Sequence, residues 1–284
     1  MVALSDGWNP AHAIAAWFDE SADRTERDIV PVLAPLVADF VEYVEPGRSD
    51  QVLDVGTGTG LAARLIAPHV RRVVGIDLSA RSLFVARRSV STPRFSGVRV
   101  AVEDAPFKDG AFSLVVASFG LNATEPGRTL RAIKRCLAPG GRLAIQEWGP
   151  ADATSRAVDD LLAACAVAEP DAALAALREA QDSLGPLWRD YLQDADDYAD
   201  WLEDAGFAVL DAAECAPVRI RLDVVDVFLR YLLAWTFRSR EVEAMAPDAR
   251  SAFLAAARAR LAQDAGPDGS LIWQPTVIRV RARR

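Results

Sequence analysis

Short apolar runs alternate with helix-like patterns through the first half of the chain. QVLDV at 51–55 is a run typical of a buried parallel strand, and apolar residues then recur at helical spacing over 61–66. Further apolar runs lie within 71–77, 98–118 and 137–148, with helical periodicity between them. Strands that alternate with helices predict βαβ units, and therefore an α/β fold with a largely parallel sheet.

Three glycines at alternate positions, Gly56, Gly58 and Gly60, separate the first strand from the first helix. Glycine lets a backbone approach a ligand closely, and the start of a helix offers free N–H groups. In an open α/β sheet such a turn is where ligands bind. The glycine turn is therefore the first candidate site.

The residues that flank the glycines limit which class of ligand the turn can bind. The dinucleotide fingerprint needs a small residue three positions after its second glycine, where this chain has Leu61, and this weakens the case for a nicotinamide dehydrogenase. No Walker A loop occurs, so there is no lysine for a β/γ-phosphate. Asp54 in front of the glycines suits a ligand with a positive group, such as S-adenosylmethionine, better than a pyrophosphate.

Other acidic residues are expected at the same edge of the sheet. Asp77 ends the second apolar run, one βαβ step after the first, so it should lie beside the glycine turn and can accept the hydroxyls of a ribose. Ser79 is the expected N-cap of the next helix. Glu103 and Asp104 end the expected third strand, within 98–104.

Together these ordered motifs resemble the class I S-adenosylmethionine-dependent methyltransferases, in the ubiquinone/menaquinone-biosynthesis (UbiE-like, type 11) branch. The segment RAIKRCLAPGGRLAIQEW is similar to the family's helix, turn and fifth strand. The resemblance implies a doubly wound, seven-stranded, mostly parallel Rossmann-like sheet with a reversed last strand, and added helices at the N-terminus and between the late strands. It implies S-adenosylmethionine as cofactor, bound by Asp54, Gly56, Thr57, Gly58, Gly60, Asp77, Leu78, Glu103, Asp104, Ala105, Ser118 and Phe119.

The chain departs from the family pattern in three places. Which of Glu103 and Asp104 meets the adenine amino group stays open, because both stand closer to the following Pro-Phe pair than is usual. Ser113 replaces a common aspartate, and Asn122 stands where many relatives carry a histidine. The last change leaves the catalytic base open.

Candidate residues for catalysis and for the acceptor lie around this core. His12 and Glu147 are the candidate bases, and Trp17, Asn122 and Trp148 are expected to line the acceptor pocket. The helix that carries His12 and Trp17 either closes over the methyl donor or only docks on the sheet domain. No metal is expected, because Ser118 stands where a ligating aspartate would be wanted. The predicted reaction is C- or O-methylation of a small apolar or aromatic molecule, and the alternative is a protein that binds the cofactor for a non-methylating or regulatory role.

Composition limits the remaining function classes. The 284 residues carry a formal net charge of −8, so no basic field attracts nucleic acid, and the arginine-rich end VIRVRARR alternates like a terminal strand with a solvated edge. No leader pattern or long apolar stretch is present, so a cytoplasmic protein without a membrane span is expected. The three cysteines are scattered, which supports neither disulfides nor zinc.

The motifs favour a single domain, with a homodimer left open. We expect a helical cap over 1–46, a cofactor core over 47–150, and acceptor-side helices with the last strands over 151–284.

Overall fold

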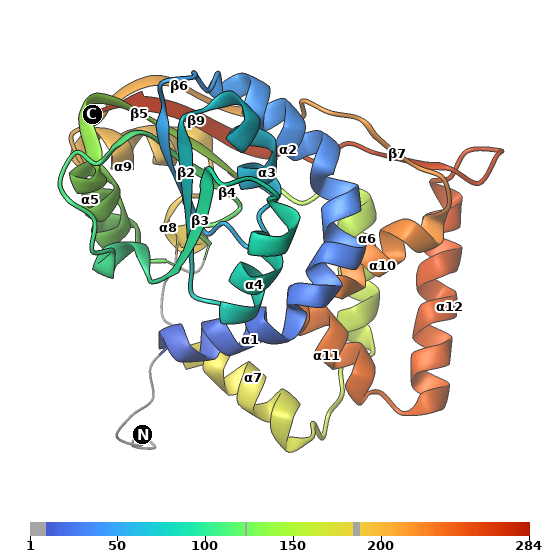
Figure 1. Ribbon diagram of the computed structural model, residues 1–284. Coiled ribbons are helices and arrows are strands. Elements are labelled where there is room, and N and C mark those ends of the chain that lie inside the picture. Colours follow the sequence, from blue (N-terminus) through green and yellow to red (C-terminus); the bar gives the residue numbers. More distant parts are fainter. Residues whose placement is uncertain (1–9, 123, 184–187) are drawn as a thin grey trace.

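A seven-stranded sheet forms the centre of the molecule (Figure 1). The computed structural model describes residues 10–122, 124–183 and 188–284, without the side chains of 10–14, 180–183 and 189. The strand order is β3-β2-β1-β4-β5-β9-β6. The strands are β1 (Gln51–Val55), β2 (Arg72–Asp77), β3 (Phe95–Arg99), β4 (Phe112–Ser118), β5 (Leu137–Trp148), β6 (Ala208–Cys215) and β9 (Val277–Arg283).

The pairing confirms the predicted doubly wound, mostly parallel sheet. Strands β1 to β5 pair in parallel, whereas β9 runs antiparallel to both β5 and β6. The order reverses between β1 and β4, and such a switch point opens a crevice at the carboxyl ends of the strands. The topology therefore places the candidate site before any side chain is considered.

Helices cover both faces of this sheet. One face packs against α2 (Val30–Val44) and α3 (Leu61–Ile66), with α4 (Ala80–Ser89) on β2 and β3. The other packs against α5 (Pro126–Cys136) and α9 (Ala195–Asp204). Alternate residues of β4 enter the two cores, so its middle, 114–117, is continuously apolar because both faces of the strand are buried there.

The added helices form a second group beside the sheet (Figure 1). A π-helical turn, Thr25–Ile29, joins α1 to α2, and α1 packs on α4. The group consists of α1 (Pro10–Arg24), α6 (Ala153–Ala164), α7 (Ala172–Ser183), α10 (Val225–Ala234), α11 (Thr236–Ala244) and α12 (Pro247–Gln263), with a separate ribbon of β7 (Ile220–Leu222) and β8 (Leu271–Trp273). The short α8 (Trp188–Tyr191) lies apart from this group, because its Trp188 packs on Tyr198 of α9 in the core of the sheet.

Two expectations about strands were wrong, and one pair of strands was not foreseen. Strand β3 ends at Arg99, and Glu103 and Asp104 lie in a short 3₁₀ turn, Val102–Asp104. Strand β9 is not a solvated edge but lies between β5 and β6, where Arg279 is 5% exposed and pairs with Asp39 of α2 at 2.5 Å. The β7–β8 ribbon was not predicted. None of the helices in the described part of the chain has the length and apolar character that a membrane span requires.

Candidate cofactor and acceptor site

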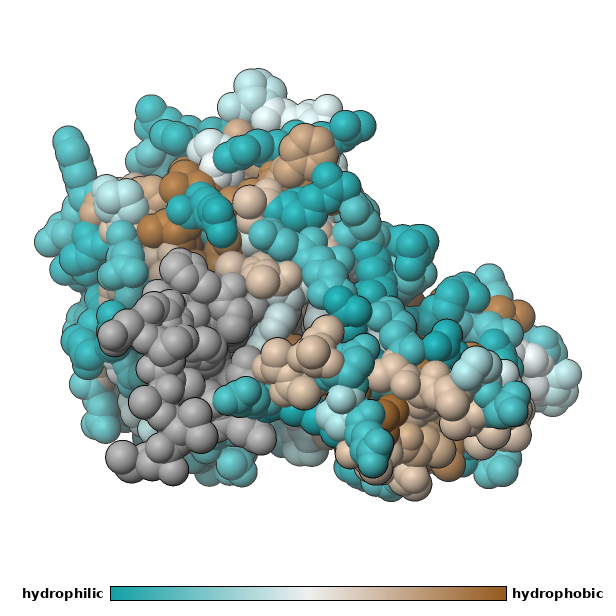
Figure 2. Space-filling model, turned by 90° about the horizontal axis from the view of Figure 1, so that it is seen from below, coloured by the Kyte–Doolittle hydropathy of each residue, from teal (hydrophilic) through white to brown (hydrophobic). Residues whose placement is uncertain are grey.

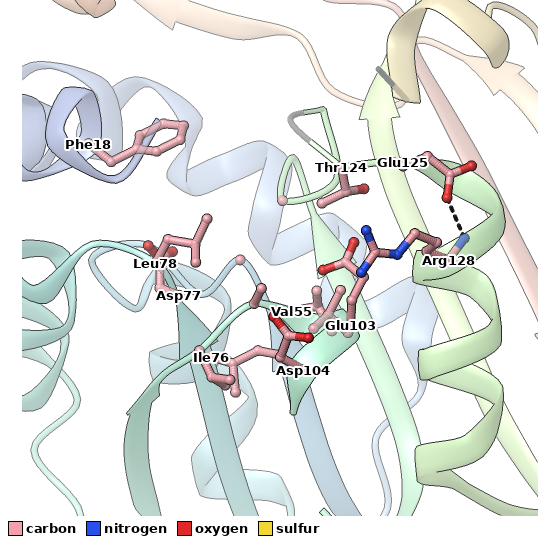
Figure 3. A pocket seen from close by; sticks show the side chains of 15 residues that line it. Phe18, Val55, Ile76, Asp77, Leu78, Glu103, Asp104, Thr124, Glu125 and Arg128 are labelled. Carbon is pink, nitrogen blue, oxygen red and sulfur yellow. Dashed lines mark hydrogen bonds between the residues drawn. The ribbon is translucent and has the colours of Figure 1, made fainter. Parts of the chain in front are cut away.

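A cavity of about 380 Å³ opens at the carboxyl ends of β1 and β2 and beside the loop that follows β4 (Figure 3). Phe18 of α1 stands across the cavity from the strand ends. Figure 2 shows the molecule from below, the side where α1 lies in Figure 1, with hydrophobic patches in a largely hydrophilic surface. The lining residues are Phe18, Val55, Gly56, Ile76, Asp77, Leu78, Val100, Ala101, Val102, Glu103, Asp104, Gly120, Thr124, Glu125 and Arg128.

The glycine turn is built by close backbone approaches. Gly56, Gly58 and Gly60 have φ values of 67°, 53° and 88°, a left-handed region that favours glycine. A Cβ on Gly56 would lie 2.5 Å from the Cα of Gly120, so the turns after β1 and β4 touch. A Cβ on Gly60 would lie 2.7 Å from Val90, so this glycine lets α3 pack on α4. Two of the three glycines therefore serve contacts between segments distant in sequence.

Asp54 lies beneath the turn and does not line the cavity. Its side chain is 1% exposed and accepts a hydrogen bond of 2.7 Å from the hydroxyl of Thr57. Burial raises the pKa of Asp54 to about 7, against the effect of the Thr57 bond. Gly75 of β2 leaves room for Thr57, because a Cβ there would come within 2.7 Å of its hydroxyl oxygen. In this structure Asp54 therefore supports the shape of the turn.

Asp77 joins the glycine turn to the start of α4. Its two oxygens accept the backbone N–H groups of Gly58 at 2.9 Å and of Ser79 at 2.8 Å. Burial raises its pKa, and these two bonds oppose that shift. Ser79 is the N-cap of α4, as predicted, because its hydroxyl oxygen accepts the N–H of Ser82. Asp77 thus lines the cavity at the end of β2.

The N-terminal helix is fastened to this same region. Asp19 of α1 accepts hydrogen bonds from the Ser79 hydroxyl at 2.6 Å and from the Arg81 N–H at 2.8 Å. Trp17 is half-buried and is not a lining residue, whereas its neighbour Phe18 lines the cavity. His12 lies in α1, but its side chain is outside the described residues. The helix therefore covers the cavity through Phe18.

The two acidic residues after β3 are not equivalent. Glu103 is half-buried, and its Oε1 accepts a hydrogen bond of 2.6 Å from the hydroxyl of Thr129 on α5. Asp104 is exposed, and its carboxylate projects into the cavity (Figure 3). Ala105 is buried and does not line the cavity, and its carbonyl oxygen accepts a bond from Arg135. Asp104 is thus the freer of the two carboxylates.

An aromatic cluster begins where β4 ends. Phe119 has a φ of 58°, unusual for a residue with a side chain, and its ring stacks on Trp148 with centroids 4.1 Å apart. Trp148 contacts Trp235 and Trp273, and the cluster continues to Tyr231 and Phe228. Phe119, Trp148 and Trp235 remain partly exposed. We call these six residues the aromatic cluster.

Glu147 lies on the opposite face of β5 from Trp148 and is buried. It is 1% exposed, and its oxygens accept the Leu121 N–H at 2.9 Å and the Asn122 side-chain amide at 2.7 Å. Burial raises the pKa of Glu147 to about 8, against the effect of these bonds. Neither Glu147 nor Asn122 is a lining residue of the cavity.

The predicted cofactor residues therefore divide into two groups. Those that line the cavity are Gly56, Asp77, Leu78, Glu103 and Asp104. Those that lie beneath or beside it are Asp54, Thr57, Gly58, Gly60, Ala105, Ser118 and Phe119. Sequence reasoning missed Phe18, Gly120 and the start of α5, although the position after the fourth strand was a signal for Gly120. Among the described residues, no group of three or more His, Cys, Asp or Glu side chains is placed to hold a metal.

Comparisons with known proteins agree with this architecture. Residues 53–145 match a family model described as a methyltransferase domain. A demethylmenaquinone methyltransferase from Clavibacter sepedonicus is 32% identical over 175 residues, which cover 59% of this chain and 69% of that protein. One from Thermus thermophilus is 39% identical over 106 residues, covering 35% of this chain and 48% of that protein. A Haloferax volcanii protein solved with the Trm112 methyltransferase activator shares the fold, with a TM-score of 0.57, 17% identity, and coverage of 94% of this chain and 96% of that chain.

Proposed function

Because the chain belongs to the UbiE-like family of class I S-adenosylmethionine-dependent methyltransferases, we propose that it methylates a small apolar or aromatic molecule. Its cofactor is S-adenosylmethionine. When bound, this cofactor supplies a methyl group that its sulfonium already makes electrophilic. The protein therefore needs to bind, align and exclude water rather than provide a covalent nucleophile.

The cavity fits this cofactor in size and in charge. Its volume of about 380 Å³ lies within the range of small-molecule sites, roughly 300 to 1,000 Å³. Asp77, Glu103 and Asp104 make its sheet side acidic, which suits a cation and a ribose and disfavours a pyrophosphate. This acidic lining beside the glycine turn is the observation that carries the proposal.

Individual roles follow from what each carboxylate already binds. Asp77 would accept the ribose hydroxyls with the lone pairs that its bonds from the Gly58 and Ser79 N–H groups leave free, since it stands at the end of β2 in the cavity wall. Asp104 would accept the adenine amino group, because its carboxylate projects into the cavity while Glu103 already accepts the Thr129 hydroxyl. Phe18 would shield the bound cofactor from water.

The aromatic cluster supports a planar, apolar acceptor. Phe119 directly precedes Gly120 of the cavity wall, and its ring continues into the partly exposed rings of Trp148 and Trp235. Such rings bind flat apolar molecules by stacking. The Clavibacter sepedonicus relative bears the name demethylmenaquinone methyltransferase, and a quinol-type aromatic is therefore the first acceptor to test, with methylation on carbon or oxygen.

Product analysis tests this function. The protein would be incubated with S-adenosylmethionine carrying a deuterated methyl group and a panel of quinols, phenols and polyketides, and the products weighed by mass spectrometry. The proposal expects the labelled methyl group in at least one aromatic acceptor, and none when the cofactor is omitted. A cofactor that binds but transfers its methyl group to no member of the panel would favour the non-methylating or regulatory role.

A further inference from the structure

The loop after β4, residues 119–122 with 124 and 125, forms one wall of the cofactor cavity. Gly120, Thr124 and Glu125 line it directly. The loop begins with Phe119 in a left-handed conformation, and Gly120 touches the glycine turn at Gly56. Phe119 is held in an unusual backbone conformation, and Gly120 is in direct contact with Gly56. This segment therefore cannot shift without altering the shape of the cavity.

Glu147 holds this loop from behind. The carboxyl group accepts the N–H of Leu121 on one oxygen, at 2.9 Å, and the side-chain amide of Asn122 on the other, at 2.7 Å. It reaches the loop from the end of β5, on a side chain that is 1% exposed. Both oxygens are therefore engaged by the loop and turned away from solvent.

A second brace reaches the same loop from α8. The N–H of Trp188 donates to the carbonyl oxygen of Thr124 at 2.8 Å, and its indole N–H donates to the hydroxyl of Tyr198 at 2.8 Å. Trp188 and Tyr198 are 0% and 1% exposed. Burial raises the pKa of Tyr198, and the nearby charge of Glu147 adds to this. The loop thus rests on a buried polar layer between β5 and the helices α8 and α9.

We propose that Glu147 is a positioning residue, which sets the shape of the cofactor cavity by holding the loop after β4 at Leu121 and Asn122, and which touches neither cofactor nor acceptor. This inference rests on the proposed function only in taking S-adenosylmethionine as the ligand of the cavity. It replaces the interpretation of Glu147 as a general base, because a base needs an oxygen within reach of the proton that it removes.

Two substitutions at Glu147 separate these roles. Glu147→Gln keeps an oxygen for the Leu121 N–H, and the amide of Asn122 can turn over to accept from the new NH₂ group, so both bonds survive. Glu147→Leu removes both bonds and leaves the buried Leu121 N–H without a partner. Glu241→Leu is the matched control, since it removes another buried carboxylate, 4% exposed, that Arg178 binds away from this loop.

The measurements are calorimetric binding of S-adenosylhomocysteine, steady-state kinetics, melting temperature and amide hydrogen exchange. We expect Glu147→Gln to stay within about threefold of the unmodified protein in Kd and kcat. Glu147→Leu should bind the ligand about tenfold more weakly, the loss expected when a buried donor goes unsatisfied, and its amides at 119–122 should exchange faster. Glu241→Leu should lower the melting temperature alone.

Three results would overturn the inference. A drop in kcat of roughly 10² to 10⁴ in Glu147→Gln, with normal ligand binding, would make Glu147 a base. Normal binding and exchange in Glu147→Leu would reduce it to a structural residue. If Glu147→Leu does not fold, Asn122→Ala can replace it, because it removes one of the two bonds to Glu147. Unchanged amide hydrogen exchange at 121–122 in Asn122→Ala would also contradict the inference. If the unmodified protein does not bind S-adenosylhomocysteine, the proposed function is contradicted instead. Amide hydrogen exchange would still test whether Glu147 holds the loop, because it needs no ligand.

Discussion

Replacing Gly120 by alanine should disturb the contact between the turns that follow β1 and β4. An added Cβ would lie 2.2 Å from the carbonyl oxygen of Val55 and 3.0 Å from the Cα of Gly56. Gly120 does not have a positive φ, so its backbone conformation itself allows alanine. Space alone forbids the methyl group, and the two turns must move apart to admit it.

The expected cost follows from overpacking. Forcing an extra carbon into a close-packed site typically costs about 1 to 3 kcal/mol. Because the atoms that must yield belong to the cavity wall, we expect a large part of this cost to appear in cofactor binding. A loss of that size corresponds to S-adenosylhomocysteine binding that is about 5- to 150-fold weaker.

Titration calorimetry would measure the affinity, and denaturant unfolding would measure the stability of the same preparations. Gly47→Ala is the matched control, because its Cβ would lie 3.4 Å from an oxygen of Asp50, an ordinary contact outside the cavity. Wild-type affinity in Gly120→Ala would refute the claim that these touching turns shape the cofactor site.

Three further predictions concern the helix cap, the acceptor and pH. Phe18→Ala should weaken S-adenosylhomocysteine binding about fivefold with little change in melting temperature, since Phe18 is 43% exposed in the cavity wall; calorimetry showing equal affinity would contradict its shielding role. Trp148→Ala should raise KM for the aromatic acceptor and leave cofactor affinity unchanged, and the reverse pattern in kinetics would argue against the aromatic cluster as the acceptor wall. Burial raises the pKa of Glu147 from 4.5 to about 8, so the folded protein keeps a proton that the unfolded chain releases; the melting temperature should fall as pH rises from about 5 to 8, less steeply in Glu147→Gln, and parallel curves would contradict this.

The position of the residues at this edge of the sheet was predictable because it depends on strand order and spacing. Asp77 and the glycine turn follow neighbouring parallel strands, whose carboxyl ends must meet at one edge of the sheet. Glu103 and Asp104 reach the cavity although their strand ends earlier than expected, because the short 3₁₀ turn carries the chain to the same edge.

What sequence patterns could not give are contacts between segments distant in the chain. Gly120 is needed because the turn at Gly56 touches it, and the sequence around Gly120 does not predict this contact. Glu147 and Asn122 are 25 positions apart, and only the pairing of β4 with β5 brings them together. The arginines of β9 suggested a solvated edge, yet Arg279 is buried because Asp39 of α2 and Gln146 of β5 bind its guanidinium.

The central claim is that the acidic cavity beside the glycine turn binds S-adenosylmethionine, and calorimetric titration of S-adenosylhomocysteine into the unmodified protein and Asp77→Ala tests it most directly. We predict one site per chain, with affinity more than tenfold weaker in the variant, because removing a charged acceptor costs about 1.5 to 3 kcal/mol. Circular dichroism would verify that the variant remains folded despite losing the bonds from Gly58 and Ser79. Absence of binding, or equal affinity in both proteins, would contradict the account.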